Sequence, residues 1–208
     1  MGWLLAMAGV WTSAVLGQDA VPPASADVPP PIAPATVKVV LRTALGDISL
    51  ALEKERAPVT VNNFLRYVDQ KRLDGTEFYR ALTLDEKGEY GLIQGGLRNN
   101  PKRVFKPIAH EPTNVTGLSH VSGAISMARA EPGTASADFF IVVGDNVSYD
   151  AHPDAGDPGY AVFGRVVEGM DVVHAILQQP RAAGTGEGVM NGQMIANPVK
   201  ILSARRAD

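Results

Sequence analysis

The chain has 208 residues, of which 45% are hydrophobic and 20% are charged, and its formal net charge is -3. This length and hydrophobic content suffice for one domain with a sizeable core. The slight acidity, and the lack of any basic run longer than Arg205-Arg206, argue against a nucleic-acid-binding protein. The chain has no cysteine, which excludes disulfides, thiolate catalysis and cysteine-ligated zinc sites.

The amino terminus is the most apolar part of the chain. Residues 3–17 contain no charged side chain, and the first basic residue is Lys38. A run of this length suits the hydrophobic segment of a secretory signal peptide and is short for a membrane-spanning helix, which needs about 20 residues. We therefore expect residues 1–20 to be a signal peptide, and no stable membrane association once it is cleaved. An uncleaved anchor and a buried helix are the alternatives.

Proline, alanine and acidic residues dominate residues 21–36, which include Pro29-Pro30-Pro31. Such a composition favours extended conformations and buries little apolar surface. We interpret this segment as a linker, with a ligand for a proline-binding module as the less favoured alternative. The folded domain is then expected over residues 37–206.

Alternating apolar and polar residues predict two strands, at 37–41 and 48–52, joined by a tight turn near Gly46-Asp47. A helix follows, because Pro58 suits a first helical turn and apolar residues then recur at helical spacing. Its apolar face would consist of Val61, Phe64, Leu65 and Val68.

Further strands are expected beyond this helix, separated by loops rich in glycine and proline. These strands lie at 77–82, 91–95, 123–128, 139–143, 161–167 and 199–204. A second helix is expected from Gly169, with Met170, Val173, Ile176 and Leu177 facing inward.

The balance of elements predicts the fold class. Eight short strands with only two helices argue against a parallel doubly wound sheet, which needs a crossover helix between most strands. A mainly β fold fits better, as a closed eight-stranded antiparallel β-barrel capped by two α-helices, because closure removes the sheet edges.

Five segments, in order along residues 37–206, resemble the cyclophilin family and in particular its bacterial exported branch. They are Phe78-Tyr79-Arg80, Gln94-Gly95-Gly96, the stretch from Gly123 to Arg129, Phe139-Phe140-Ile141, and the stretch from Tyr160 to Val166. The resemblance implies an eight-stranded barrel with two capping helices and peptidyl-prolyl cis–trans isomerase activity on proline-containing polypeptides. It also implies a role in folding exported proteins, in the periplasm.

Isomerase chemistry can be argued from the residues themselves. Rotation about an Xaa–Pro bond breaks amide resonance, and the barrier is about 18–20 kcal/mol. In the twisted transition state the proline nitrogen becomes a better hydrogen-bond acceptor, so a fixed guanidinium binds that state best. The resemblance assigns this role to Arg80, the contact with the substrate backbone to Gln94, and the floor of the proline pocket to Phe140. No proton transfer, metal or cofactor is needed.

The resemblance also assigns residues to substrate binding. Leu92 and Tyr160 would form walls of the proline pocket, while Ala128, Arg129 and Ala130 would pair through their backbone with the residues before the proline. Asp138 and Tyr149 occupy substrate-binding positions at which the family usually has other side chains. By contrast, Phe78, Phe139 and Phe163 are expected in the core.

Several features keep an alternative function open. The connector 81–93 is longer than in the common form, and Gly91 stands where the family usually has an aromatic residue, for which Tyr90 is a candidate substitute. The alternative is a catalytically weakened barrel that binds peptides or acts as a chaperone. A hydrolase is disfavoured because no Ser/His/Asp pattern is visible, and the loop 150–157 suits a solvated turn better than a metal site. We expect a monomer.

Overall fold

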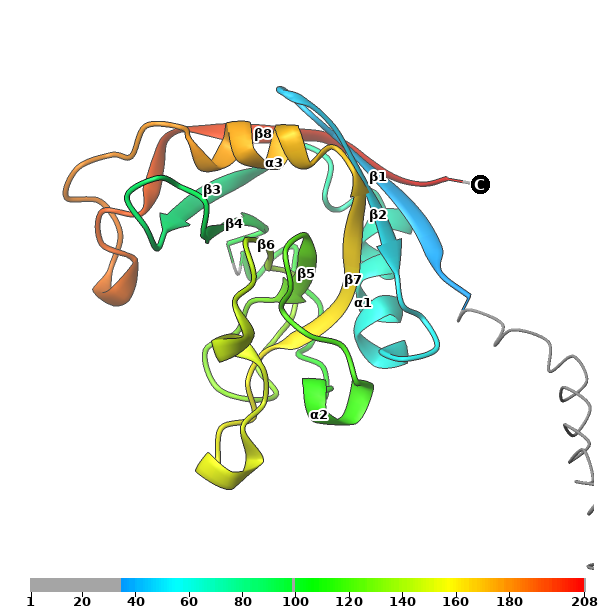
Figure 1. Ribbon diagram of the computed structural model, residues 1–208. Helices are drawn as coiled ribbons and strands as arrows, with labels where there is room; N and C mark the ends of the chain where they lie inside the picture. The colour runs from blue at the N-terminus through cyan, green and yellow to red at the C-terminus, as the bar shows by residue number, and fades with distance from the viewer. Residues whose placement is uncertain (1–34, 99, 208) are drawn as a thin grey trace, which may run out of the picture. The chain divides into compact units, whose positions relative to one another are not determined.

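The computed structural model describes residues 35–98 and 100–207, so the predicted signal peptide and all but the end of the linker lie outside the described residues. Eight strands form a closed antiparallel barrel in the order β1-β2-β7-β5-β6-β4-β3-β8 (Figure 1). The strands are β1 (Val37–Thr43), β2 (Gly46–Leu52), β3 (Thr76–Thr83), β4 (Gly91–Gly96), β5 (Ala124–Met127), β6 (Phe139–Val143), β7 (Ala161–Glu168) and β8 (Met194–Ala207). The predicted fold class is confirmed.

Two helices pack on different strands of the barrel, as expected from their apolar faces. Helix α1 (Pro58–Asp69) packs on β7 and β8, whereas α3 (Met170–Leu177) packs on β2, β3, β4 and β6. Figure 1 shows the two helices well apart. The Phe64 ring of α1 meets Phe139 of β6 edge-on, with 5.4 Å between the ring centroids. A short helix, α2 (Thr113–Thr116), was not predicted.

Strand β8 is much longer than the predicted 199–204. It runs from Met194 and pairs first with β3 and then with β1, which closes the barrel. Its register against β3 shifts between the pair Phe78↔Val199 and the pair Arg80↔Met194. Pro198 lies within this irregular stretch, where its missing N–H costs no ladder hydrogen bond. Asn197 and Pro198 hid this part of the strand from pattern analysis.

The first hairpin has a tight turn, as predicted, but Gly46 and Asp47 belong to β2 and not to the turn. Thr43 pairs with Gly46, so Ala44 and Leu45 alone form the turn. The φ of Gly46 is 136°, and a Cβ there would lie 2.7 Å from Cγ2 of Val172 in α3. Glycine is therefore needed at this position both for its backbone conformation and for the packing of α3.

Side chains of β6 alternate between two hydrophobic clusters. Phe139, Ile141 and Val143 belong to the main core inside the barrel. Phe140 and Val142 belong to a second, smaller cluster. The period of two in a strand places this second cluster on the outside of the barrel wall. Within the described residues, no helix is long and apolar enough to cross a membrane.

Candidate active site

An irregularity in β3 determines where Arg80 points. The pairing of β3 with both neighbouring strands shifts between Phe78 and Arg80, which marks a β-bulge. Phe78 and Ala81 both pack in the main core although they are three positions apart, which strict strand alternation would not allow. Bulges commonly redirect a side chain in this way next to functional sites.

The register of the barrel aligns the three predicted catalytic residues. Arg80 of β3 pairs with Gln94 of β4, and Gln94 pairs with Phe140 of β6. Residues paired directly across neighbouring strands project to the same face of a sheet. Arg80, Gln94 and Phe140 therefore form one row on the outer face, and Ser126 of β5 continues it as the partner of Phe140.

Two carboxamides hold the guanidinium of Arg80. Nη1 donates to Oε1 of Gln94 at 2.7 Å, and Nε donates to Oε1 of Gln193 at 2.8 Å. Arg80 is half-buried, and this burial lowers the pKa of its guanidinium from the usual value. Gln193 precedes β8 and was not among the predicted site residues, since nothing in the sequence relates it to a residue so far away.

Tyr79 supports the row through Gln94. Nε2 of Gln94 donates to the Tyr79 hydroxyl at 2.8 Å, so both ends of this buried carboxamide are engaged. Burial and the neighbouring carboxylate of Asp138 raise the pKa of Tyr79. Asp138 is itself buried, and its Oδ1 accepts the backbone N–H of Arg98 at 2.8 Å. Its side chain thus supports Tyr79 and the strand end, while the predicted substrate contact remains a prediction.

An aromatic cluster adjoins this row. Tyr160 meets Phe140 edge-on at 5.5 Å between ring centroids, and Tyr149 meets it edge-on at 6.1 Å. Leu92 packs in the same cluster, so the two predicted walls, Leu92 and Tyr160, both lie next to Phe140. Burial raises the pKa of Tyr149, and the nearby charge of Arg80 opposes that rise. The guanidinium thus stands at the border of an apolar, aromatic surface, an arrangement typical of small-ligand and peptide sites.

The structure corrects one expectation from the sequence, that no Ser/His/Asp arrangement exists. The His120 imidazole lies 3.0 Å from Oγ of Ser126 through Nε2 and 2.6 Å from Oδ1 of Asp150 through Nδ1. Both Ser126 and His120 are fully buried, at 0% exposure. No substrate can reach such a serine, so the arrangement gives no hydrolase chemistry and instead supports Phe140, against which the His120 ring packs.

Arg129 holds a loop and one of the pocket aromatics. Its guanidinium donates to the Gly159 carbonyl and lies over the Tyr160 ring, with Cζ 4.7 Å from the ring centroid. The N–H of Ala128 donates to the Asp138 carbonyl, and that of Ala130 donates to the Thr134 hydroxyl. Backbone pairing of a substrate with these two residues would therefore use their carbonyl groups.

The long connector between β3 and β4 forms a closed turn. Both carboxylate oxygens of Asp85 accept backbone N–H groups, from Glu89 and Tyr90. A Cβ on Gly91 would lie 2.2 Å from the Leu82 carbonyl oxygen, so this position has no room for an aromatic side chain. The Tyr90 ring instead packs over Gly144, at the end of β6, which does not support Tyr90 as a substitute for the missing aromatic residue.

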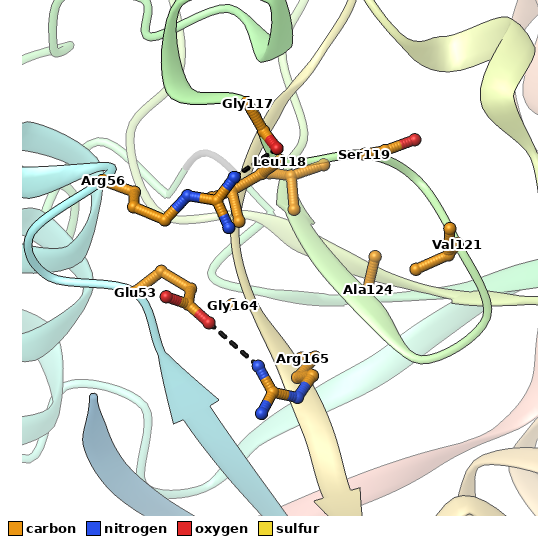
Figure 2. Close-up of a pocket in the computed structure, with 10 residues that line it drawn as sticks. Glu53, Arg56, Gly117, Leu118, Ser119, Val121, Ala124, Gly164 and Arg165 are labelled. Carbon is orange, nitrogen blue, oxygen red and sulfur yellow. Dashed lines mark hydrogen bonds and ion pairs between the residues drawn. The ribbon is translucent and has the colours of Figure 1, made fainter. Parts of the chain in front are cut away.

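A separate pocket of about 200 Å³ lies beside the second cluster, between the segment that joins β2 to α1, the strands β5 and β7, and the loop 117–121 (Figure 2). Figure 2 shows the Glu53 carboxylate and the Arg165 guanidinium pointing toward one another, 2.9 Å apart. Arg56 donates to the carbonyls of Thr116 and Gly117 at the far wall. None of the predicted catalytic residues lines this pocket, so it is distinct from the row that contains Arg80.

Comparisons with known proteins agree on one family. The family pattern described as "Cyclophilin type peptidyl-prolyl cis-trans isomerase/CLD" matches residues 37–206. A peptidyl-prolyl cis-trans isomerase of Acinetobacter baylyi is 36% identical over 174 residues, covering 82% of this chain and 86% of the relative. Peptidyl-prolyl cis-trans isomerase A of Dickeya dadantii is 38% identical over 169 residues, covering 79% and 84%.

A solved structure supports the fold. A cyclophilin-type peptidyl-prolyl cis-trans isomerase of Cryptosporidium parvum, crystallised in the presence of the dipeptide Ala-Pro, has a TM-score of 0.66 and 19% sequence identity. The match covers 82% of this chain and 99% of the Cryptosporidium parvum chain. On the strength of the family match and the bacterial relatives, the chain belongs to the cyclophilin-type peptidyl-prolyl cis–trans isomerases.

Proposed function

We propose that the domain accelerates rotation about Xaa–Pro bonds, with Arg80 as the donor to the proline nitrogen in the twisted transition state. The observation that supports this proposal is that two hydrogen bonds hold the guanidinium of Arg80, which lies in one row with Phe140. In the planar ground state the nitrogen lone pair is conjugated with the carbonyl and accepts poorly. A donor aimed at that nitrogen therefore stabilises the transition state more than the substrate, which is the condition for catalysis.

Phe140 and its neighbours supply the rest of the mechanism. The proline ring would lie on the aromatic surface formed by Phe140, Tyr149 and Tyr160, while the acyl side of the bond rotates. An arginine does not deprotonate under physiological conditions, so Arg80 acts as a permanent donor. Each tenfold acceleration requires about 1.4 kcal/mol of differential binding, within the range of aimed hydrogen bonds to a charged group.

The biological role that we propose is to assist the folding of exported proteins, in the periplasm. The support is the apolar run over residues 3–17, followed by the proline-rich segment 21–36. Cell fractionation and amino-terminal sequencing of the mature protein test this part. Cleavage near residue 20 with recovery in the periplasm is the expected result, and an intact cytoplasmic chain would contradict it.

A second candidate is a peptide-binding module or chaperone with weakened catalysis. The observation that favours it is the altered rim, where Gly91 has no aromatic side chain and Tyr90 packs elsewhere. Against it stands Arg80, which keeps both of its carboxamide partners. The two candidates bind the same proline-containing peptides and differ only in turnover.

One experiment separates these candidates. The cis–trans exchange rate of a Xaa-Pro peptide is measured by NMR with wild type, Arg80→Ala and the control Arg42→Ala, which removes an exposed arginine of β1. We expect acceleration by wild type and Arg42→Ala and a strong loss in Arg80→Ala. Peptide binding without acceleration by wild type would establish the module instead. Full activity in Arg80→Ala would eliminate the assigned mechanism.

A further inference from the structure

We propose that Gln193, on the loop before β8, is a positioning residue that aims the Arg80 guanidinium at the substrate. The inference rests on the proposed function and extends it to a residue that lies 113 positions away in sequence. Its basis is the hydrogen bond from Arg80 to the carboxamide of Gln193, in addition to the one to Gln94. The orientation of Arg80 therefore depends on the α3–β8 loop as well as on β4.

The geometry of the two hydrogen bonds restrains Arg80. Nε donates to Gln193 and Nη1 donates to Gln94, so two different nitrogens of one planar group are held from two sides. Two anchored nitrogens fix both the position of the guanidinium and the rotation of its plane. Among the described residues no acceptor is bonded to Nη2, which leaves that nitrogen to donate to a bound peptide. A single bond to Gln94 would fix the position alone.

The backbone of Gln193 is itself held next to Arg80. Its carbonyl accepts the N–H of Ala81 at 3.0 Å, directly beyond Arg80 in β3. Arg181, at the other end of the loop, donates from Nε to the Ala81 carbonyl at 2.7 Å. Both ends of the loop therefore attach to the same residue of β3, and the Gln193 side chain starts from a fixed point.

The Gln193 carboxamide also has a second bond that could serve the loop alone. Its Nε2 donates to the Val189 carbonyl at 2.6 Å. The two functions use different atoms, since Oε1 receives Arg80 and Nε2 holds the loop. A glutamate at position 193 could still accept from Arg80 but could not donate to Val189. This difference separates positioning of Arg80 from support of the loop.

Positioning has a specific kinetic consequence. An arginine side chain with one anchor samples orientations in which the donor misses the proline nitrogen, and misplacement by about 1 Å costs on the order of a hundredfold in rate. Because the contact with that nitrogen forms only in the transition state, loss of orientation should lower kcat and leave KM nearly unchanged.

The experiment compares Gln193→Ala, Gln193→Glu and the control Gln178→Ala, which alters an exposed glutamine at the end of α3. We expect Gln193→Ala to lose about ten- to a hundredfold in kcat, as for a lost hydrogen bond to a charged group, with KM changed less than about twofold. Gln193→Glu should keep most of the activity, and Gln178→Ala all of it. In parallel, the Nε–Hε NMR resonance of Arg80 in the free protein should move in Gln193→Ala and stay hydrogen-bonded in Gln193→Glu.

Three results would overturn the inference. Equal losses in Gln193→Ala and Gln193→Glu would show that the Val189 bond matters and that Arg80 is held without Gln193. An unchanged Arg80 resonance in Gln193→Ala would show that no anchoring bond exists in solution. Full activity of Gln193→Ala, in an assay where wild type is active and Arg80→Ala is not, would refute positioning while leaving the proposed function intact. An inactive wild type, in contrast, would remove the proposed function itself and the kinetic claim with it.

Discussion

The imidazole of His120 lies parallel to the ring of Phe140, with 5.8 Å between the ring centroids and 8° between the ring planes. His120 thus packs against the proposed floor of the proline pocket. It also makes edge-to-face contacts with Tyr149 and Tyr160, so one buried ring contacts all three aromatic residues of the pocket. Through its two nitrogens, the same ring is tied to Asp150 and Ser126, which sets its orientation.

Replacing His120 by alanine should therefore destabilise the barrel and loosen the pocket. The change leaves a cavity beneath Phe140 and leaves the buried Ser126 hydroxyl without its imidazole partner, which together cost about 3 kcal/mol. Urea unfolding measures the stability, and titration with a proline peptide measures the pocket. The control is His152→Ala, an exposed histidine, which should change stability by less than about 0.5 kcal/mol. Equal effects of the two substitutions would contradict the supporting role of His120.

The same histidine should make stability depend on pH. Burial lowers the pKa of His120 in the folded state, although the Asp150 carboxylate opposes the shift. An unfolded histidine has a pKa of about 6.5, so below that pH the unfolded chain binds a proton that the folded state resists. Stability should therefore fall as the pH drops from about 6.5 toward the lower folded pKa.

Urea midpoints between about pH 7.5 and pH 5 check this, with His120→Gln as the variant that does not titrate. As the pH falls, the urea midpoint of wild type should decrease relative to that of His120→Gln, because only wild type has the titrating imidazole. Two carboxylates do not interfere in this range. The pKa values of Asp69 and Asp74 are lowered by Arg206 and Arg205, so their contributions to folding stability are lost only near and below about pH 4. A constant difference between the two proteins from pH 7.5 to pH 5 would refute titration of His120 in this range.

Sequence patterns predicted what depends on neighbours along the chain. The core position of Phe139 was predicted, and the resemblance of five segments to one family related Phe140 to Arg80. The bulge that redirects Arg80 was not predictable, because it arises from how β3 fits its two partner strands. Gln193 and His120 were missed for a similar reason, since their partners Arg80 and Asp150 are distant in sequence and only the folded barrel brings them close.

Arginine itself, and not only a positive charge, should be required at position 80. Lysine keeps the charge but lacks the planar guanidinium. That group donates to Gln94 and Gln193 and still has a third nitrogen that can donate to a substrate. We expect Arg80→Lys to fold normally and to lose at least about tenfold in kcat/KM, equivalent to about 1.4 kcal/mol of transition-state stabilisation. NMR exchange of a Xaa-Pro peptide measures the rate, and a circular dichroism melt verifies the fold. Activity of Arg80→Lys within about twofold of wild type would mean that charge alone suffices.

Introducing the missing aromatic residue at Gly91, on the rim of the pocket, should destabilise the protein. A phenylalanine at Gly91 would begin with a Cβ only 2.2 Å from the Leu82 carbonyl oxygen, which belongs to the β3–β4 ladder and cannot move without breaking pairing. Overpacking of this kind costs about 1–3 kcal/mol. Gly91→Ala, which adds the same Cβ with no ring, should show most of that loss in urea unfolding. If Gly91→Phe were as stable as wild type and bound proline peptides more tightly, the rim would be adaptable, and the long connector could then be treated as an ordinary variant of the family's pocket.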